Sequence, residues 1–325
     1  MTKTVGTFSR DGNRAAQLSN VALLYYGEGL TQSDIAKRLQ VSRVTVVNLL
    51  REARESGIVE IRVDGKQFAE NGTGRSLRDK FGLRDVYISD TFLPPDNDRA
   101  ARLRHIGRVS AMALLDLVEP GDRIGVAWGE TVLALSDALP RQQVDGAEVN
   151  QLIGSMISDR VPASETCTIQ IASQIGARCY TLHAPAMVST PELAQTLRAE
   201  PTIAAQMQRL EQLDLAVYSV GNTSSDTHLV SSGMASPQDM AHARQAGAVG
   251  VICCRYIDAQ GQECALSPSD RLISAPLHSL KAARKKLLVV SGVDRLDATR
   301  AALTGGLVTH LCADRDLAEA LLATE

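Results

Sequence analysis

The sequence predicts an α/β protein in two parts: an N-terminal winged helix-turn-helix, residues 1–65, and a large doubly wound, Rossmann-like domain with a mainly parallel sheet, residues 66–325. Three short amphipathic segments separated by tight breaks predict the first part. A polar, glycine-rich stretch over residues 64–76 indicates the boundary. Helical and strand patterns then alternate to the end of the chain, which is typical of a parallel sheet with helices on both faces.

Length and composition agree with this division. A chain of 325 residues exceeds what one hydrophobic core usually supports. Hydrophobic residues make up 44% and charged residues 22%, the balance of a globular protein. Aromatic residues make up only 3%, so aliphatic side chains must fill the core, which favours layered α/β packing.

The net charge of −3 hides an uneven distribution, because residues 31–54 carry five basic side chains against two acidic ones. The N-terminus lacks the apolar run of a signal peptide, so none is predicted. No stretch is long and apolar enough to predict a membrane span. The six cysteines lack CxxC spacing and are expected to be reduced thiols. These features predict a cytoplasmic location without membrane association.

Capping residues and short breaks mark the N-terminal elements in turn. Apolar residues recur at helical spacing over residues 14–26. Thr31, with an aspartate three residues later, resembles a capping box and starts a second helix. Ser42 is the expected N-cap of a third helix, which ends near residue 56 before a glycine. The alternating segment 58–63 predicts a strand, which would form the wing.

The third helix has the two faces that a recognition helix needs, with Val46, Leu49, Leu50 and Ala53 as its buried stripe. We expect seven residues to contact operator DNA. Ser42, Arg43, Thr45 and Asn48 would lie near bases or phosphates, and Lys37, Arg38 and Arg51 near the phosphate backbone. The alternative is a small helical module for protein contacts or dimerisation. Agreement among the caps, the glycine stop and the basic bias favours DNA.

In the second part, strands and helices are predicted as follows. The strands are Val86–Ser89, Arg123–Ala127, Glu148–Ile153, Leu215–Val220, Val249–Tyr256, Leu287–Ser291 and Val308–Ala313. The helices include Arg99–Leu117, Thr131–Ala138, Ser164–Ile175, Pro237–Ala246, Arg295–Leu303 and Leu317–Leu322.

Four segments resemble the SorC/DeoR-type regulators of sugar catabolism: Leu30–Val63, Ile124–Val132, Gly247–Gly261 and Val289–Asp314. The resemblance covers nearly the whole chain. It implies an effector domain similar to sugar-phosphate isomerase folds, binding of a sugar, sugar alcohol or sugar phosphate, and dimers or tetramers on operator DNA. One departure is Val47-Asn48 in the third helix, where a Ser-Arg pair is common, so the operator sequence is not transferred.

The segment from Gly125 to Thr131 reads as a strand that turns into a helix start. Ligands of open α/β sheets bind beyond the carboxyl ends of the strands, and backbone N–H groups at such a turn hold anions or hydroxyls. An ordinary turn between strand and helix is the alternative. With the resemblance added, we expect Trp128, Gly129, Glu130 and Thr131 to contact the effector.

Glu130 bears on the ligand class, because family members that bind sugar phosphates tend to carry a small hydroxyl residue here. A carboxylate 4 Å from a phosphate is repelled by about 1–4 kcal/mol, depending on screening. Either Glu130 points away from the site, or the ligand is an uncharged sugar or polyol whose hydroxyls it accepts. The second reading is preferred.

Other candidates follow predicted strands. Val251 stands where the family often has an acidic residue, which puts the usual sugar specificity in doubt. Arg295 falls where a family lysine is common and could close over a ligand or pair with Asp294 or Asp297. Hydroxyl partners are also expected at strand ends: Gln151, Asn222 and Asp226.

No metal, cofactor or catalytic residue is predicted. The histidines lack metal-binding spacing, no P-loop or nucleophile elbow occurs, and Cys253-Cys254 in a strand would point to opposite faces. The sequence therefore predicts an effector-controlled transcriptional regulator of a carbohydrate or polyol catabolic operon. Two alternatives are a sugar isomerase-like enzyme with an attached DNA-binding module, and a constitutive DNA-binding protein whose large domain serves oligomerisation.

Overall fold

The computed structural model describes residues 12–59, 72–89, 99–156, 165–225, 227–266 and 269–323. The chain divides into two compact units, Met1–Val63 and Asp64–Glu325, and each is treated by itself below. No helix in the described ranges is long and apolar enough to cross a lipid bilayer.

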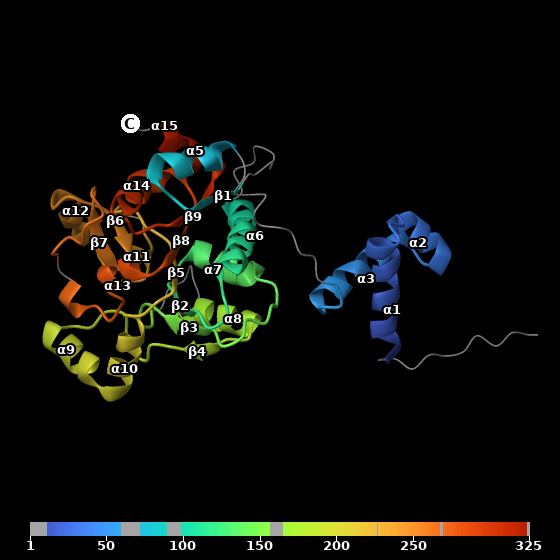
Figure 1. Ribbon diagram of the computed structural model, residues 1–325, viewed down its shortest axis with the longest axis horizontal. Helices are drawn as coiled ribbons and strands as arrows, with labels where there is room; N and C mark the ends of the chain where they lie inside the picture. Colours follow the sequence, from blue (N-terminus) through green and yellow to red (C-terminus); the bar gives the residue numbers. More distant parts are fainter. Residues whose placement is uncertain are drawn as a thin grey trace, which may run out of the picture. The chain divides into compact units, whose positions relative to one another are not determined.

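The described part of the first unit, residues 12–59, is a helical bundle: α1 (Gly12–Ala22), which continues as the π-helical segment η1 (Leu23–Gly27), α2 (Gln32–Leu39) and α3 (Arg43–Glu55) (Figure 1). The predicted caps are present, since the hydroxyls of Thr31 and Ser42 each accept a hydrogen bond from the backbone N–H three residues on. Gln40 ends α2 in the left-handed conformation, with φ of 54°. The strand expected over 58–63 lies mostly outside the described residues, so the wing stays a prediction.

The core of the first unit joins all three helices. Its fully or nearly fully buried side chains are Leu18, Val21, Ala22, Leu24, Ile35, Ala36, Val46, Leu49, Leu50 and Ala53. The four expected residues of α3 are among them, so the opposite side of α3 is left on the surface.

The second unit is built on a seven-stranded sheet in the order β1-β9-β8-β5-β2-β3-β4, with every neighbouring pair parallel. Its strands are β1 (Asp85–Ser89), β2 (Arg123–Val126), β3 (Glu148–Gln151), β4 (Arg178–Tyr180), β5 (Leu215–Tyr218), β8 (Lys285–Val290) and β9 (His310–Asp314). A separate antiparallel hairpin consists of β6 (Ala248–Ile252) and β7 (Arg255–Asp258).

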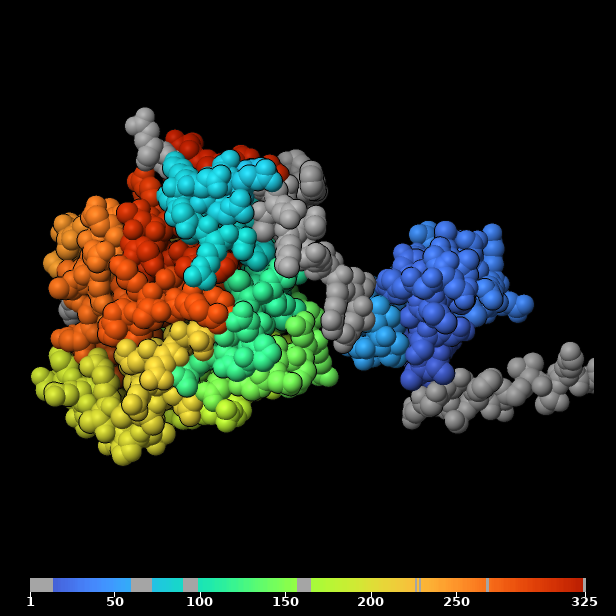
Figure 2. Space-filling model, in the orientation of Figure 1, coloured from blue at the N-terminus to red at the C-terminus, as the bar shows by residue number. Residues whose placement is uncertain are grey.

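Helices connect these strands. They are α5 (Gly72–Phe81), α6 (Arg99–Leu117), α7 (Glu130–Ala138), α8 (Glu165–Ile175), α9 (Pro191–Ala199), α10 (Pro201–Arg209), α11 (His228–Ser231), α12 (Pro237–Gln245), α13 (Leu277–Ala282), α14 (Leu296–Thr304) and α15 (Arg315–Ala323). Within this unit, α5 and α15 lie at one end and α9 and α10 at the other (Figures 1 and 2).

Hydrophobic residues cover both faces of the sheet, as the sequence predicts. On β8, Leu287 and Val289 pack into one cluster with α6, α7 and α8. Leu288 and Val290, which point the opposite way, pack into a second cluster with helices that include α12, α14 and α15. The fold class is therefore the predicted one, α/β with a parallel sheet buried on both sides.

Two helices of the first cluster approach unusually closely. A Cβ atom on Gly107 of α6 would lie 2.3 Å from the backbone oxygen of Ala134 on α7, so only glycine allows this contact. The two helices therefore meet backbone to backbone.

The largest error of the sequence prediction is the single strand over Val249–Tyr256. The structure has a hairpin there, because Cys253 and Cys254 form its turn with φ of 50° and 65°. Two consecutive residues with positive φ are the signature of a type I′ turn, which usually carries Asn and Gly. The cysteines concealed the turn. Strand β4 and helices α5, α9, α10, α11 and α13 were not predicted.

Candidate functional site

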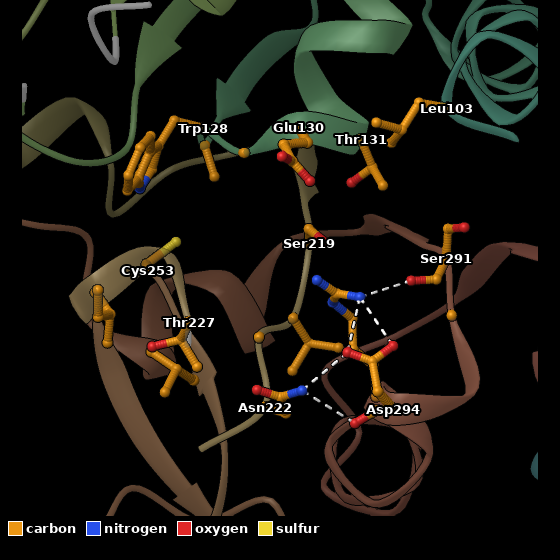
Figure 3. Close-up of a pocket in the computed structure, with 18 of the residues that line it drawn as sticks. Leu103, Trp128, Glu130, Thr131, Ser219, Asn222, Thr227, Cys253, Ser291 and Asp294 are labelled. Atoms are coloured by element: carbon orange, nitrogen blue, oxygen red, sulfur yellow. Dashed lines mark hydrogen bonds and ion pairs between the residues drawn. The ribbon is translucent and has the colours of Figure 1, made fainter. Parts of the chain in front are cut away.

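A cavity of about 170 Å³ opens at the carboxyl ends of β2, β5 and β8. From β2 the chain passes to β3 and β4 on one side, and it then returns to β5 on the other side of β2. This is the topological switch point where open α/β sheets bind ligands. The residues that follow the three strands, Ala127–Thr131, Ser219–Asn222 and Ser291–Gly292, all line the cavity (Figure 3).

The N-terminus of α7 forms one wall of this cavity. Gly129 is its N-cap, with φ of 139° and ψ of 161°, a conformation that residues other than glycine rarely adopt. The hydroxyl of Thr131 donates a hydrogen bond of 2.9 Å to the carbonyl of Val289, which fixes the first turn of α7 against β8. The positive end of the helix dipole therefore faces the cavity.

Glu130 lies on the cavity wall and does not point away from it. Its carboxylate is directed toward Ser219 in Figure 3. It forms an ion pair with Arg99, the first residue of α6, and the side chains of Glu130 and Arg99 are 18% and 57% exposed. The carboxylate thus enters the site with a cationic partner from a different helix, and Arg102 of α6 also lines the cavity.

Asp294 and Arg295 form a second ion pair, on the side of the cavity opposite Glu130. The guanidinium of Arg295 is 3.2 Å from the Asp294 carboxylate and donates a hydrogen bond of 2.8 Å to the carbonyl of Ser291. The amide of Asn222 donates to the same carboxylate at 2.9 Å (Figure 3). Of the two partners expected for Arg295, the structure has Asp294, while Asp297 pairs with Arg300.

Asp314 contacts the segment Ser291–Gly292, which lines the cavity, and was not predicted as a site residue. One oxygen of its buried carboxylate accepts hydrogen bonds from the hydroxyl of Ser291 at 2.6 Å and the N–H of Gly292 at 2.7 Å. The other accepts from the N–H of Leu317, at the start of α15, at 2.9 Å. An acidic residue between the last strand and the last helix was the signal that could have identified it.

The rest of the lining is mostly apolar. It includes Leu103, Trp128, Ile153, Val220, Leu229, Val251, Cys253 and Cys254. Trp128 is the one tryptophan of the sequence. A mostly apolar wall with a few fixed polar groups is typical of sites for small molecules.

Cys253 and Cys254 lie together in the hairpin turn, so the expectation that they point to opposite faces of a strand is wrong. Burial raises the pKa of the Cys254 thiol to about 12 and raises that of Cys253 further. Both side chains are therefore protonated at neutral pH and act as small apolar groups.

The cavity contains six of the eight residues expected to contact an effector: Trp128, Gly129, Glu130, Thr131, Asn222 and Arg295. Gln151 is not part of the lining, because its buried amide donates to the carbonyl of Ile153 at 2.6 Å and accepts from the N–H of Leu182 at 2.9 Å. Asp226 lies outside the described residues. Nothing in the sequence pointed to Arg99 or Arg102, which reach the site from the start of α6.

The residues expected at DNA are grouped on the surface of the first unit. Ser42, Arg43, Asn48 and Arg51 are exposed on α3, as are Lys37 and Arg38 in the last turn of α2, and Thr45 is half-buried. Ser42 and Thr45 share a side-chain hydrogen bond of 2.8 Å, and Arg51 donates to Asn48 at 3.2 Å. Among the described residues, no three His, Cys, Asp or Glu side chains gather as metal ligands.

Comparisons with known proteins follow the same division. Residues 68–323 match the family described as "Putative sugar-binding domain", and residues 19–56 match region 4 of sigma-70 factors, a stretch that contains α2 and α3. The helix-turn-helix and the α/β domain together define a class, the DNA-binding transcriptional regulators with a domain of the sugar-binding family.

Similar regulators span almost the whole chain. The transcriptional regulator YjhU of Escherichia coli is 36% identical over 93% of both chains. The deoxyribonucleoside regulator of Bacillus subtilis is 30% identical, covering 94% of this chain and 97% of its own. The full-length sorbitol operon regulator SorC of Klebsiella pneumoniae has the same fold, with a TM-score of 0.70, 24% identity, and coverage of 95% of this chain and 99% of its own.

The protein belongs to the SorC/DeoR-type family of transcriptional regulators. Its relatives are regulators rather than enzymes, as the sequence predicts.

Proposed function

We propose that this regulator controls an operon for the use of a carbohydrate or polyol, and that its effector is an unphosphorylated sugar or polyol bound in the cavity at the switch point. The observation that supports this ligand class best is Glu130, whose carboxylate lines the cavity and is already paired with Arg99. A carboxylate accepts hydrogen bonds from hydroxyls, and it repels a phosphate group that lies next to it.

The second ion pair supports the same ligand class. Asp294 and Arg295 neutralise one another and still present both acceptors and donors. Trp128 offers a flat apolar surface that can pack against the carbon skeleton of a sugar. Of the eight expected effector contacts, Gln151 is not included in this proposal, because its amide is occupied by the backbone.

Control of DNA binding would follow from unequal affinity. An effector shifts the protein toward one conformation only by as much as it prefers that conformation. We propose that the protein acts as a dimer or tetramer, so that paired helix-turn-helix units bind two half-sites of operator DNA through the seven residues named above.

Tryptophan fluorescence tests the ligand class directly, because Trp128 has no second tryptophan to compete with it. The full-length protein is titrated with sugars, polyols and their phosphates, and its melting temperature is measured in parallel, since a ligand of the folded state raises it. We expect saturable changes with unphosphorylated compounds. Responses only to phosphorylated compounds would leave the regulator assignment intact but refute the proposed ligand class.

A further inference from the structure

Helix α3 carries apolar side chains on the side where a surface helix normally carries polar ones. Val44 is 68% exposed and Val47 is 41% exposed. At 100° per residue, Val44 lies opposite the middle of the buried stripe formed by Val46, Leu49, Leu50 and Ala53. Val44 therefore lies on the most exposed face of α3.

This side chain gains little from packing against the described residues of its own unit. An exposed side chain gains little from burial, and valine is a weaker helix former than alanine. The neighbours on the same surface, Arg43, Asn48 and Arg51, are the polar types that contact bases and phosphates. An apolar patch within a DNA-contacting surface implies an apolar partner on the DNA.

The major groove offers one such group, the 5-methyl of thymine, which alone distinguishes thymine from uracil. We propose that Val44 and Val47 bind thymine methyl groups in the operator and thereby select thymine at two nearby base pairs, which rests on the operator binding through α3 proposed above. The two valines are three residues apart, a rise of about 4.5 Å along the helix. This spacing is close to the roughly 3.4 Å between successive base pairs, so one helix turn can contact neighbouring steps.

The test uses the full-length protein and DNA that it selects itself. Duplexes are enriched from a random-sequence pool, and the best sequence is resynthesised with deoxyuridine in place of each thymine in turn. Dissociation constants are measured at one salt concentration, because affinity for DNA depends steeply on salt. At two thymines per half-site we expect replacement by uracil to raise the dissociation constant about fourfold. Burial of one methyl group contributes about 0.8 kcal/mol, and about 1.4 kcal/mol corresponds to a tenfold change in affinity.

Valine variants then assign each methyl group to a side chain. In Val44→Ala the penalty for uracil should vanish at one position, and in Val47→Ala at the other. Both sites are exposed and alanine favours helix, so neither variant should lose its fold. Leu23→Ala is the matched control, because Leu23 is 59% exposed in the same unit but lies outside α3, and it should retain both penalties.

Three results would overturn the proposal. The first is a selected sequence in which no thymine-to-uracil change weakens binding. The second is a pair of uracil penalties that persist unchanged in both valine variants. The third is a change of self-association in Val44→Ala with the penalties intact, which would show that the exposed valines contact a second copy of the chain instead of DNA.

Discussion

Neutralising Glu130 should turn the effector site toward anionic ligands. In Glu130→Gln the negative charge is removed while the size and most hydrogen-bonding capacity are kept, and the guanidinium of Arg99 loses its partner. Two unit charges 4 Å apart interact by about 1 kcal/mol in water and about 4 kcal/mol at an effective dielectric constant of 20. Because Arg99 is 57% exposed, the aqueous end of this range applies, which corresponds to about fivefold in affinity.

The assay is the ratio of two dissociation constants, one for an unphosphorylated sugar or polyol and one for its phosphate, from Trp128 fluorescence. We expect this ratio to move at least about fivefold toward the phosphate in Glu130→Gln. Asp297→Asn is the matched control, because it removes the same charge from an exposed residue outside the cavity lining. The reasoning fails if the ratio is unchanged in Glu130→Gln, or if Asp297→Asn changes it equally.

Three further predictions concern stability and reactivity. Asp314→Asn replaces one accepting oxygen with a donor and should lower the free energy of unfolding by roughly 2–3 kcal/mol in urea titrations; an unchanged midpoint would contradict the network around Ser291. Glycine adopts the left-handed conformation of residue 40 without strain, so Gln40→Gly should stabilise the unit by up to about 1 kcal/mol. Amide hydrogen exchange in α2 and α3 should therefore become slower, and faster exchange would refute this. At pH 8 iodoacetamide should modify exposed Cys179 before Cys254, whose pKa of about 12 leaves about one thiol in ten thousand ionised; modification of Cys254 should accelerate tenfold per pH unit up to that pKa, and a flat pH profile would be inconsistent with the raised value.

The elements that the sequence predicted best are those with local signals. Helix starts depend on interactions within a few residues of one another. The structure has helix starts at Thr31, Ser42 and Gly129, as these local patterns predict. The hairpin at Cys253 was missed for the same reason, since its turn lacks the residues that usually mark a type I′ turn. Local patterns predict a turn only when the usual residues are present.

The site shows a different limit. Gly129, Glu130 and Arg295 could be proposed because each follows a predicted strand, because parallel strands end at one edge of the sheet, and because the family resemblance pointed to the same positions. Arg99 could not, because its position depends on how α6 crosses the sheet, and Gln151 was proposed on the same strand-end argument although its amide is used by the backbone. Side-chain partners across elements are set by tertiary packing.

The glycine contact between α6 and α7 has a consequence for these partners. Arg99 and Glu130 sit on the two helices that Gly107 and Ala134 hold backbone to backbone, and the contact lies only two turns from Arg99 and one from Glu130. Because Gly107 has a hydrogen atom where other residues have Cβ, α6 and α7 can approach this closely. The spacing of the two helices in turn determines the distance across which Arg99 and Glu130 meet. Gly107 thus bears on the shape of one wall of the cavity, although it is not itself part of the lining.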